Sequence, residues 1–134
     1  MDSDVLDCMT MPTLERFIPK TVGEKPWGIE LLVAHTPHYT GKVLLMNAGH
    51  RGGLQYHNEK DETFYLHDGQ ALVELDPGTG VLEARTMEAG ESYHVPPGAV
   101  HRVTALSDCV FFEASTPHFE DRVNVSHIYE PEEP

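Results

Sequence analysis

The sequence contains 134 residues, and its 9 Lys and Arg residues against 22 Asp and Glu residues give a formal net charge of −13. This length suits one domain that buries about two-thirds of its unfolded surface without disulfides. The negative charge excludes nucleic acid as the main partner, because phosphates would be repelled over most of the surface. Apolar runs such as residues 29–34 are too short to cross a bilayer, so we expect no membrane insertion.

The cysteines and the first residues predict a reducing compartment. Cys8 and Cys109 are the two cysteines, and two cysteines make no disulfide framework. Residues 1–10 are acidic and have no basic flank, so they do not have the pattern of a signal peptide. We therefore expect a cytoplasmic protein.

Residues 1–19 are predicted to form an N-terminal arm outside the core. They are acidic, rich in methionine and interrupted by proline, with one short helical candidate over Pro12–Ile18. Leu14, Phe17 and Ile18 are the apolar side chains that this arm offers for docking. An arm of this kind can cover the exposed edge strand of a neighbouring subunit, so we expect a homodimer.

From Lys20 onward, short runs of Val, Leu, Phe and Tyr alternate with turns that contain Gly and Pro. The runs predict strands at residues 29–35, 42–47, 53–58, 62–67, 71–76, 81–87, 92–95, 100–106 and 109–115. Short strands with turns about every 8–12 residues predict an all-β sandwich, jelly roll or barrel. Residues 116–134 are polar and acidic, which favours a partly frayed tail on a single domain spanning 20–134.

The segment 49–69 carries polar side chains at strand spacing. Because alternate residues of a strand share a face, Gln55, His57 and Glu59 are predicted to project together. A turn or bulge at residues 60–61 follows, and Glu62 begins the inward face of the next strand.

A second segment, residues 90–101, brings His101 in directly after a rigid Pro-Pro-Gly turn. Two histidines and two carboxylates that converge inside an apolar barrel need a cation, because unpaired buried carboxylates are costly. Imidazole and carboxylate ligands without a thiolate suit one divalent transition metal: Mn, Fe, Zn, Ni or Co.

These two segments resemble the paired motifs of the cupin superfamily, whose members are small jelly-roll β-barrels of two packed antiparallel sheets with a metal site. The first motif is Gly, five residues, His-x-His, three or four residues, Glu, six residues and Gly; its spacing holds from His57 through Glu62 to Gly69. The second motif fits at His101. The resemblance implies the ligands His57, Glu62 and His101, with Glu59 in place of the family's second histidine.

Three further segments, at residues 25–30, 54–57 and 119–122, are similar to mannose-6-phosphate isomerases of the bifunctional, guanylyltransferase-linked type. This similarity implies an aldose–ketose isomerase that acts on a sugar or sugar phosphate through an enediol. Glu59 would then be the spare carboxylate for the proton transfer. Candidate substrate-binding residues are Gln55, which resembles a family position that faces the pocket, and the basic side chains expected near the barrel mouth, Arg51 and Lys42.

Several alternatives stay open at this point. Glu59 is a fourth metal ligand, the general base or an outward-facing side chain. Two histidines and one carboxylate also form the site of non-haem Fe(II) dioxygenases. A third possibility is a non-catalytic cupin that binds a sugar or small acid. On the strands, we expect His94 to lie at the surface and Arg102 to point outward.

Overall fold

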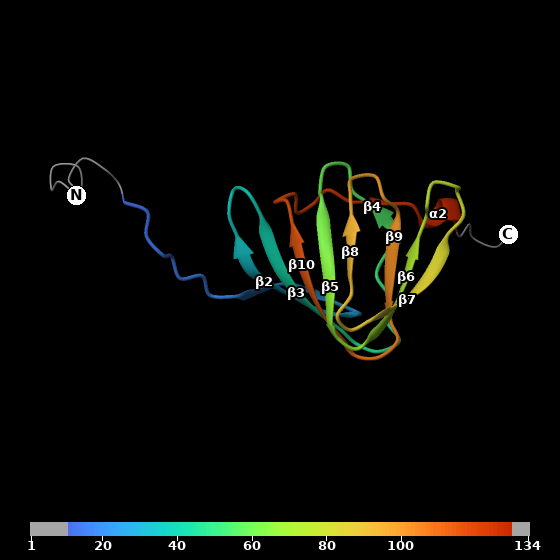
Figure 1. The fold of residues 1–134 in the computed structure, drawn as a ribbon, viewed down its shortest axis with the longest axis horizontal. Coiled ribbons are helices and arrows are strands. Elements are labelled where there is room, and N and C mark those ends of the chain that lie inside the picture. The colour runs from blue at the N-terminus through green and yellow to red at the C-terminus, as the bar shows by residue number, and fades with distance from the viewer. Residues whose placement is uncertain (1–10, 130–134) are drawn as a thin grey trace.

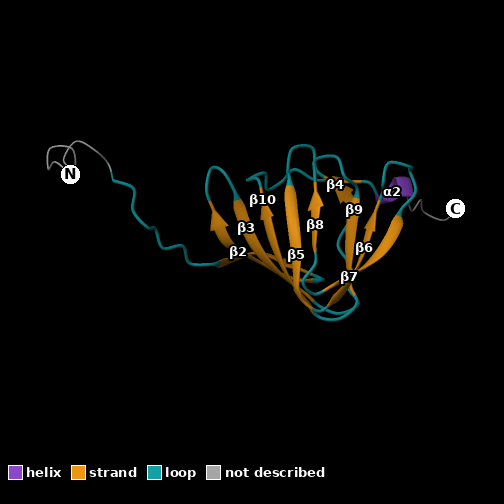
Figure 2. Ribbon diagram, viewed as in Figure 1, coloured by secondary structure: helices purple, strands orange, loops and turns teal. Residues whose placement is uncertain are grey.

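The computed structural model describes residues 11–129, and these form two antiparallel sheets packed face to face (Figure 1). Strands dominate the architecture, and one short helix follows them near the C-terminus (Figure 2). The six-stranded sheet has the order β1 (Lys20–Lys25), β2 (Gly28–His35), β3 (Thr40–Met46), β10 (Cys109–Ser115), β5 (Glu62–Asp68) and β8 (Ser92–Val95). The five-stranded sheet has the order β11 (Val123–Asn124), β4 (Gln55–Tyr56), β9 (His101–Ala105), β6 (Gln70–Leu75) and β7 (Glu83–Glu88). The all-β fold of two packed antiparallel sheets is confirmed.

The core lies between the two sheets, and its side chains follow the predicted alternation. On β5, Glu62, Phe64 and Leu66 are buried and alternate with partly exposed neighbours. On β8, Val95 is buried whereas His94 is exposed, as the sequence predicted. The period of two is what one buried face of each strand requires.

The first part of the chain differs from the prediction. Residues 11–19 contain no helix, so the helical candidate over Pro12–Ile18 is wrong. A helix of two turns is too short to be stable without tertiary packing, and this segment leads away from the barrel (Figure 1). The side chain of Leu14 is fully exposed. The described part of the arm therefore makes no core, and residues 1–10 lie outside the described residues.

The C-terminal part is more ordered than expected up to residue 129. Strand β11 pairs with β4, and the helix α2 (Ser126–Tyr129) follows it. Arg102 is buried, not solvated: its guanidinium makes two 3.0 Å hydrogen bonds to the Glu74 carboxylate. Among residues 11–129, no helix is long and apolar enough to span a membrane.

Candidate metal centre

His101 is positioned by the turn that precedes it. The turn spans residues 96–99 and is closed by a hydrogen bond from the Ala99 N–H to the Pro96 carbonyl. Gly98 has a φ of 87°, a left-handed conformation that glycine adopts without strain. His101 then begins β9, and its Nδ1 lies 2.9 Å from the Ala99 carbonyl oxygen.

His57 is held by a residue 64 positions later in the sequence, Asp121. It follows the short strand β4, and its Nδ1 lies 2.6 Å from the main-chain carbonyl oxygen of Asp121. The carboxylate of the same Asp121 accepts hydrogen bonds from the backbone N–H groups of Asn58, Glu59 and Lys60. One residue in the loop 116–122 therefore fixes both the His57 ring and the chain that follows it.

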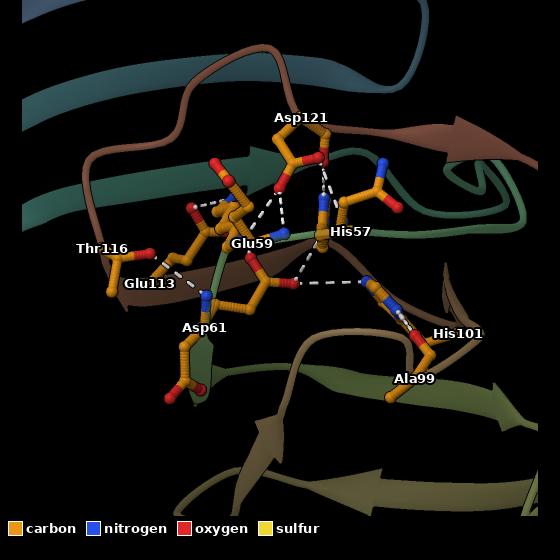
Figure 3. A network of polar contacts seen from close by, with 11 residues as sticks. His57, Glu59, Asp61, Ala99, His101, Glu113, Thr116 and Asp121 are labelled. Carbon is orange, nitrogen blue, oxygen red and sulfur yellow. Dashed lines mark hydrogen bonds and ion pairs between the residues drawn. The ribbon is translucent and has the colours of Figure 1, made fainter.

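Both imidazoles point at one carboxylate. His57 Nε2 lies 3.5 Å and His101 Nε2 lies 3.2 Å from Glu62 Oε1 (Figure 3). One ligand atom from each of the three residues lies within 4.8 Å of the other two, and all three side chains are buried. His57 Nε2 has no hydrogen-bond partner among the described residues. A buried nitrogen of this kind is costly to leave unpaired, so the cluster is suited to receive a cation.

The hydrogen bonds on the far side of each ring set the tautomers. A carbonyl oxygen can only accept a hydrogen bond, so Nδ1 of His57 and of His101 each carries a proton. In the neutral imidazole this leaves the lone pair on Nε2, the atom that faces Glu62. Metal-binding histidines are commonly oriented in this manner by a carbonyl or carboxylate behind the ring.

The electrostatics of the cluster also favour positive charge. Burial opposes the charge on Glu62, but the imidazoles of His101 and His57 beside it hold the pKa of its carboxyl far below the usual range. Burial alone would lower the pKa of His57, but the adjacent Glu62 carboxylate and the hydrogen bond to the Asp121 carbonyl raise it above the ordinary value. The cluster thus attracts protons, and a metal that binds there would displace them.

A buried ion pair lies beside the cluster, and the sequence analysis did not find it. Lys60 Nζ lies 2.8 Å from Glu62 Oε2 and 3.4 Å from Glu113 Oε2, so the residue predicted as part of a turn points into the barrel. Burial lowers the pKa of Lys60, but the two carboxylates more than compensate and raise it. Burial and the nearby charge of Glu62 raise the pKa of Glu113 to about 7.

The cluster opens into a cavity of about 140 Å³. Of the predicted substrate-binding residues, Gln55 and Lys42 line this cavity, and Arg51 does not. Arg51 instead forms an isolated β-bridge with Thr104. Arg122, Trp27 and Glu113 line the cavity and were not among the predicted site residues.

Glu59 lies outside the cluster. Its side chain is 73% exposed, and its carboxylate lies 3.5 Å from His118 on the surface. The loop held by Asp121 turns the Lys60 side chain toward the barrel interior and the Glu59 side chain toward solvent. Strand alternation had predicted that Glu59 faces the interior. Of the three alternatives left open for Glu59, the outward-facing one describes the structure, and the ligand and base roles are corrected.

Comparisons with known proteins agree with this architecture. The sequence profile of the cupin domain matches residues 42–115, which is more than half of the chain. The chain belongs to the cupin family. No curated protein sequence matches this cupin.

Solved structures resemble this cupin in fold. KdgF from Halomonas sp. superposes with a TM-score of 0.65 at 23% identity, over 75% of this chain and 88% of KdgF. The capsular polysaccharide assembling protein CapF from Staphylococcus aureus gives 0.70 at 16% identity, over 82% of this chain and 32% of CapF. Oxalate decarboxylase from Bacillus subtilis gives 0.69 at 18% identity, over 81% of this chain and 30% of the enzyme. This cupin therefore spans about a third of the two longer proteins.

The structure also corrects the position at which this cupin departs from the family motif. Counted from Gly49, the motif has five residues before Gln55, one residue before His57 and four before Glu62. Gln55 therefore stands where the family has its first histidine, and His57 is the second. Gln55 lines the cavity and pairs in register with His101, whereas Glu59 does neither. The spacing from Gly49 was the signal that could have placed this residue.

Replacing Gln55 by histidine is expected to strengthen metal binding, because a second imidazole would enter the cluster from a position that already lines the cavity. Glu59→His is the matched control, and it should leave the affinity unchanged because this side chain points to solvent. Competition with a chromogenic chelator measures both affinities. Tighter binding in Glu59→His but not in Gln55→His would contradict this placement.

Asp121→Asn should destabilise the folded protein at neutral pH. Hydrogen bonds from the backbone N–H of Glu59, and also from Lys60 and Asn58, lower the pKa of Asp121 to about 2. A lowered pKa means that the charged carboxylate stabilises the fold above its unfolded pKa, near about 3.9, and that this contribution is lost as the pH falls toward 2. The difference in melting temperature between wild type and Asp121→Asn should therefore be largest near pH 7 and shrink below pH 4. A difference that stays constant down to pH 3 would show that the charge of Asp121 does not act in this way.

Proposed function

We propose that this cupin is a metal-dependent aldose–ketose isomerase that acts on a sugar or a sugar phosphate through an enediol. The observation that carries the proposal is the convergence of the His57 and His101 Nε2 atoms on the Glu62 carboxylate at the bottom of a cavity. Two structural relatives are an oxalate decarboxylase and a capsular polysaccharide assembling protein, which supports a small-molecule substrate.

The residues present fit a divalent metal. His57, Glu62 and His101 would hold it, since their buried ligand atoms lie together and His57 Nε2 lacks another partner. A mixed imidazole and carboxylate set suits Mn, Fe, Co, Ni or Zn. When bound, the metal would supply a Lewis acid that stabilises negative charge on the substrate's carbonyl oxygen.

The cavity also holds groups that can move a proton. An aldose–ketose isomerase removes a proton from the carbon next to the carbonyl and returns it to the adjacent carbon, which needs a base beside the substrate. Glu113 is largely but not fully buried, lines the cavity and lies 3.4 Å from Lys60 Nζ. We assign the proton transfer to the Glu113 carboxylate in place of Glu59, with the Lys60 ammonium holding it in position. Gln55 can donate and accept hydrogen bonds to substrate hydroxyls from the cavity wall.

Exchange of carbon-bound protons in D₂O tests the proposed reaction before the product is known. The full-length protein is loaded with each divalent metal in turn and incubated with aldoses, ketoses and their phosphates. Deuterium at the carbon next to the carbonyl, detected by NMR and absent with the metal-free protein, is the expected result. No exchange with any of these substrates in a metal-loaded protein would overturn the isomerase proposal.

One observation favours a second candidate function. Two histidines and one carboxylate are the ligands of non-haem Fe(II) dioxygenases, and this set is present in His57, His101 and Glu62. Oxygen uptake that depends on both Fe(II) and substrate would support the dioxygenase, whereas proton exchange with Mn or Zn under nitrogen would support the isomerase.

We also propose that the protein is a homodimer whose contact is the outer face of the six-stranded sheet. The central strands of this sheet place apolar side chains outward, and the exposed Ile29, Leu45 and Phe112 are examples. The outward positions carry no charged side chain on β2 (Ile29, Leu31, Val33), β3 (Gly41, Val43, Leu45) or β10 (Val110, Phe112, Ala114). A second copy fits this face, because two chains that each carry −13 can approach only through a surface without charge.

The position of the N-terminal arm also favours a second copy of this chain as the partner. It leaves the barrel next to β1, the edge strand of this sheet, and it exposes Leu14 and Ile18 (Figure 1). The face and the arm would therefore contribute to one continuous contact with the second copy.

Light scattering should give twice the chain mass of 15.0 kDa for the wild type. Phe112→Lys should give a monomer, because it places a charge in the middle of the proposed contact. Ala84→Lys, on the exposed strand β7 of the other sheet, is the matched control and should remain dimeric. A monomeric wild type at micromolar concentration would refute the dimer.

A further inference from the structure

A second hollow, of about 420 Å³, adjoins the cavity of the metal centre. The two spaces are adjacent, because they share four lining residues: Lys42, Arg122, Glu30 and Phe119. Lys25 lines the outer one. The metal centre thus lies at the inner end of a space whose outer part is bordered by three cationic side chains.

The cations at this mouth lack hydrogen-bonded anions. Lys42 is buried, and its Nζ lies 3.7 Å from Glu30, beyond the 2.7–2.9 Å that is typical of a charge-assisted hydrogen bond. Its other neighbour is the ring of Phe119, with a centroid 5.2 Å away. Neither Arg122 nor Lys25 makes a hydrogen bond or ion pair with any residue between 11 and 129. The long ion pair with Glu30 leaves the Lys42 ammonium able to donate hydrogen bonds to an anion that enters the hollow.

The charge around the mouth differs from that of the rest of the molecule. Four of the nine basic residues of the chain, namely Lys25, Lys42, Lys60 and Arg122, line the two adjacent spaces. Four glutamates line them as well, so the lining is neutral, whereas the whole chain carries −13. A divalent metal would make the lining positive. At physiological salt the charges beyond about 8 Å are largely screened, so the local charges, and not the net charge of the chain, decide what binds.

We propose that the substrate carries a terminal oxyanion group, a carboxylate or a phosphate, and that Lys42 and Arg122 bind it. This inference rests on the proposed function, because it places the opposite end of the same molecule at the metal centre. The arginine guanidinium offers two parallel N–H donors that match an oxyanion, and the lysine ammonium supplies a point charge beside it.

The inner cavity sets the size of the rest of the substrate. Its volume of about 140 Å³ accommodates roughly ten water-sized groups, because one such group needs about 10–15 Å³. This is the size of a monosaccharide. Trp27 and Phe119 line the same space and can pack against the apolar faces of a sugar ring. The substrate class is therefore a sugar acid or a sugar phosphate, because a neutral sugar would give Lys42 and Arg122 no anion to bind.

Titration of the metal-free, full-length protein with inorganic phosphate at physiological ionic strength tests the anion site separately from the isomerase. Calorimetry or ³¹P NMR should detect phosphate binding that weakens at least about tenfold in Lys42→Met and in Arg122→Gln. Lys20→Met is the matched control, since Lys20 is exposed and lines neither space, and its affinity should stay at the wild-type value. Circular dichroism confirms that each variant is folded.

Competition then identifies the anion. Glucuronate and glucose 6-phosphate should each displace phosphate, and glucose should not. If glucuronate binds more tightly, the substrate is a sugar acid; if glucose 6-phosphate does, the substrate is a sugar phosphate. Absence of phosphate binding, unchanged affinity in both variants, or displacement by glucose at the same concentration would overturn the proposal. Phosphate binding without proton exchange in D₂O would leave the anion site standing and remove the isomerase. Proton exchange without phosphate binding would do the reverse.

Discussion

The double variant His57→Ala/His101→Ala is expected to lose its metal while the barrel remains folded. Two of the three side chains whose ligand atoms converge on the cavity are removed, and only Glu62 remains. Changes to residues that merely orient ligands already weaken metal binding about 10–100-fold, so the loss of two ligands should exceed this range. Elemental analysis of protein reconstituted with Mn, Fe or Zn and then desalted measures the remaining metal.

The matched control is His94→Ala. His94 is also a strand histidine beside a carboxylate, 2.6 Å from Asp61, but its imidazole is 61% exposed on the outer surface. It should retain the metal content of the wild type. Stoichiometric metal in the double variant would refute the assignment of the ligands, and equal loss in His94→Ala would point to a general effect of removing histidines.

Glu113→Gln is expected to reduce turnover by about 10²–10⁴-fold with the metal content unchanged. The amide keeps the shape of the side chain and can still accept a hydrogen bond from Lys60, but it cannot take a proton from the substrate. The rate of deuterium incorporation from D₂O reports the proton transfer directly, and elemental analysis reports the metal.

Glu59→Gln separates this role from a general effect of carboxylate loss. Its side chain is exposed and lies outside the cavity, so its turnover should match the wild type. A large loss of turnover in Glu59→Gln with normal turnover in Glu113→Gln would reverse the assignment. Loss of metal in Glu113→Gln would show instead that this residue supports the ligand Glu62.

The strands were predictable because their signals are local. Alternating burial and Gly- or Pro-containing turns lie within a few residues of one another, and each of the nine predicted runs overlaps an observed strand. Strand β1 was missed because its sequence KTVGEK is polar, and its six residues form a strand by pairing with β2. Strand β11 has two residues, too few for any periodicity. The predicted strand 53–58 shortens to β4, where the chain turns toward the cavity.

The three candidate metal ligands could be predicted for a different reason. His57, Glu62 and His101 occupy fixed intervals in motifs that the sequence retains, and the structure brings these three together. Lys60 and Glu113 were missed because their ion pair joins residues 53 positions apart, which no local pattern reveals. Glu59 was misplaced because strand alternation was extended into a loop whose shape depends on Asp121.

The hydrogen bond between His57 and Asp121 joins residues 64 positions apart, and this separation fixes the order in which the site can be assembled. During synthesis, the chain as far as β10 contains all three ligands but not the carbonyl that orients His57. A nascent chain that has reached only residue 115 can pair its major strands. It still lacks the Asp121 carbonyl that keeps the proton on Nδ1 of His57 and directs Nε2 toward Glu62. A metal that binds this cluster would therefore be held fully only once Asp121 is in place, and a protease cut between residues 116 and 120 should weaken its binding about 10–100-fold.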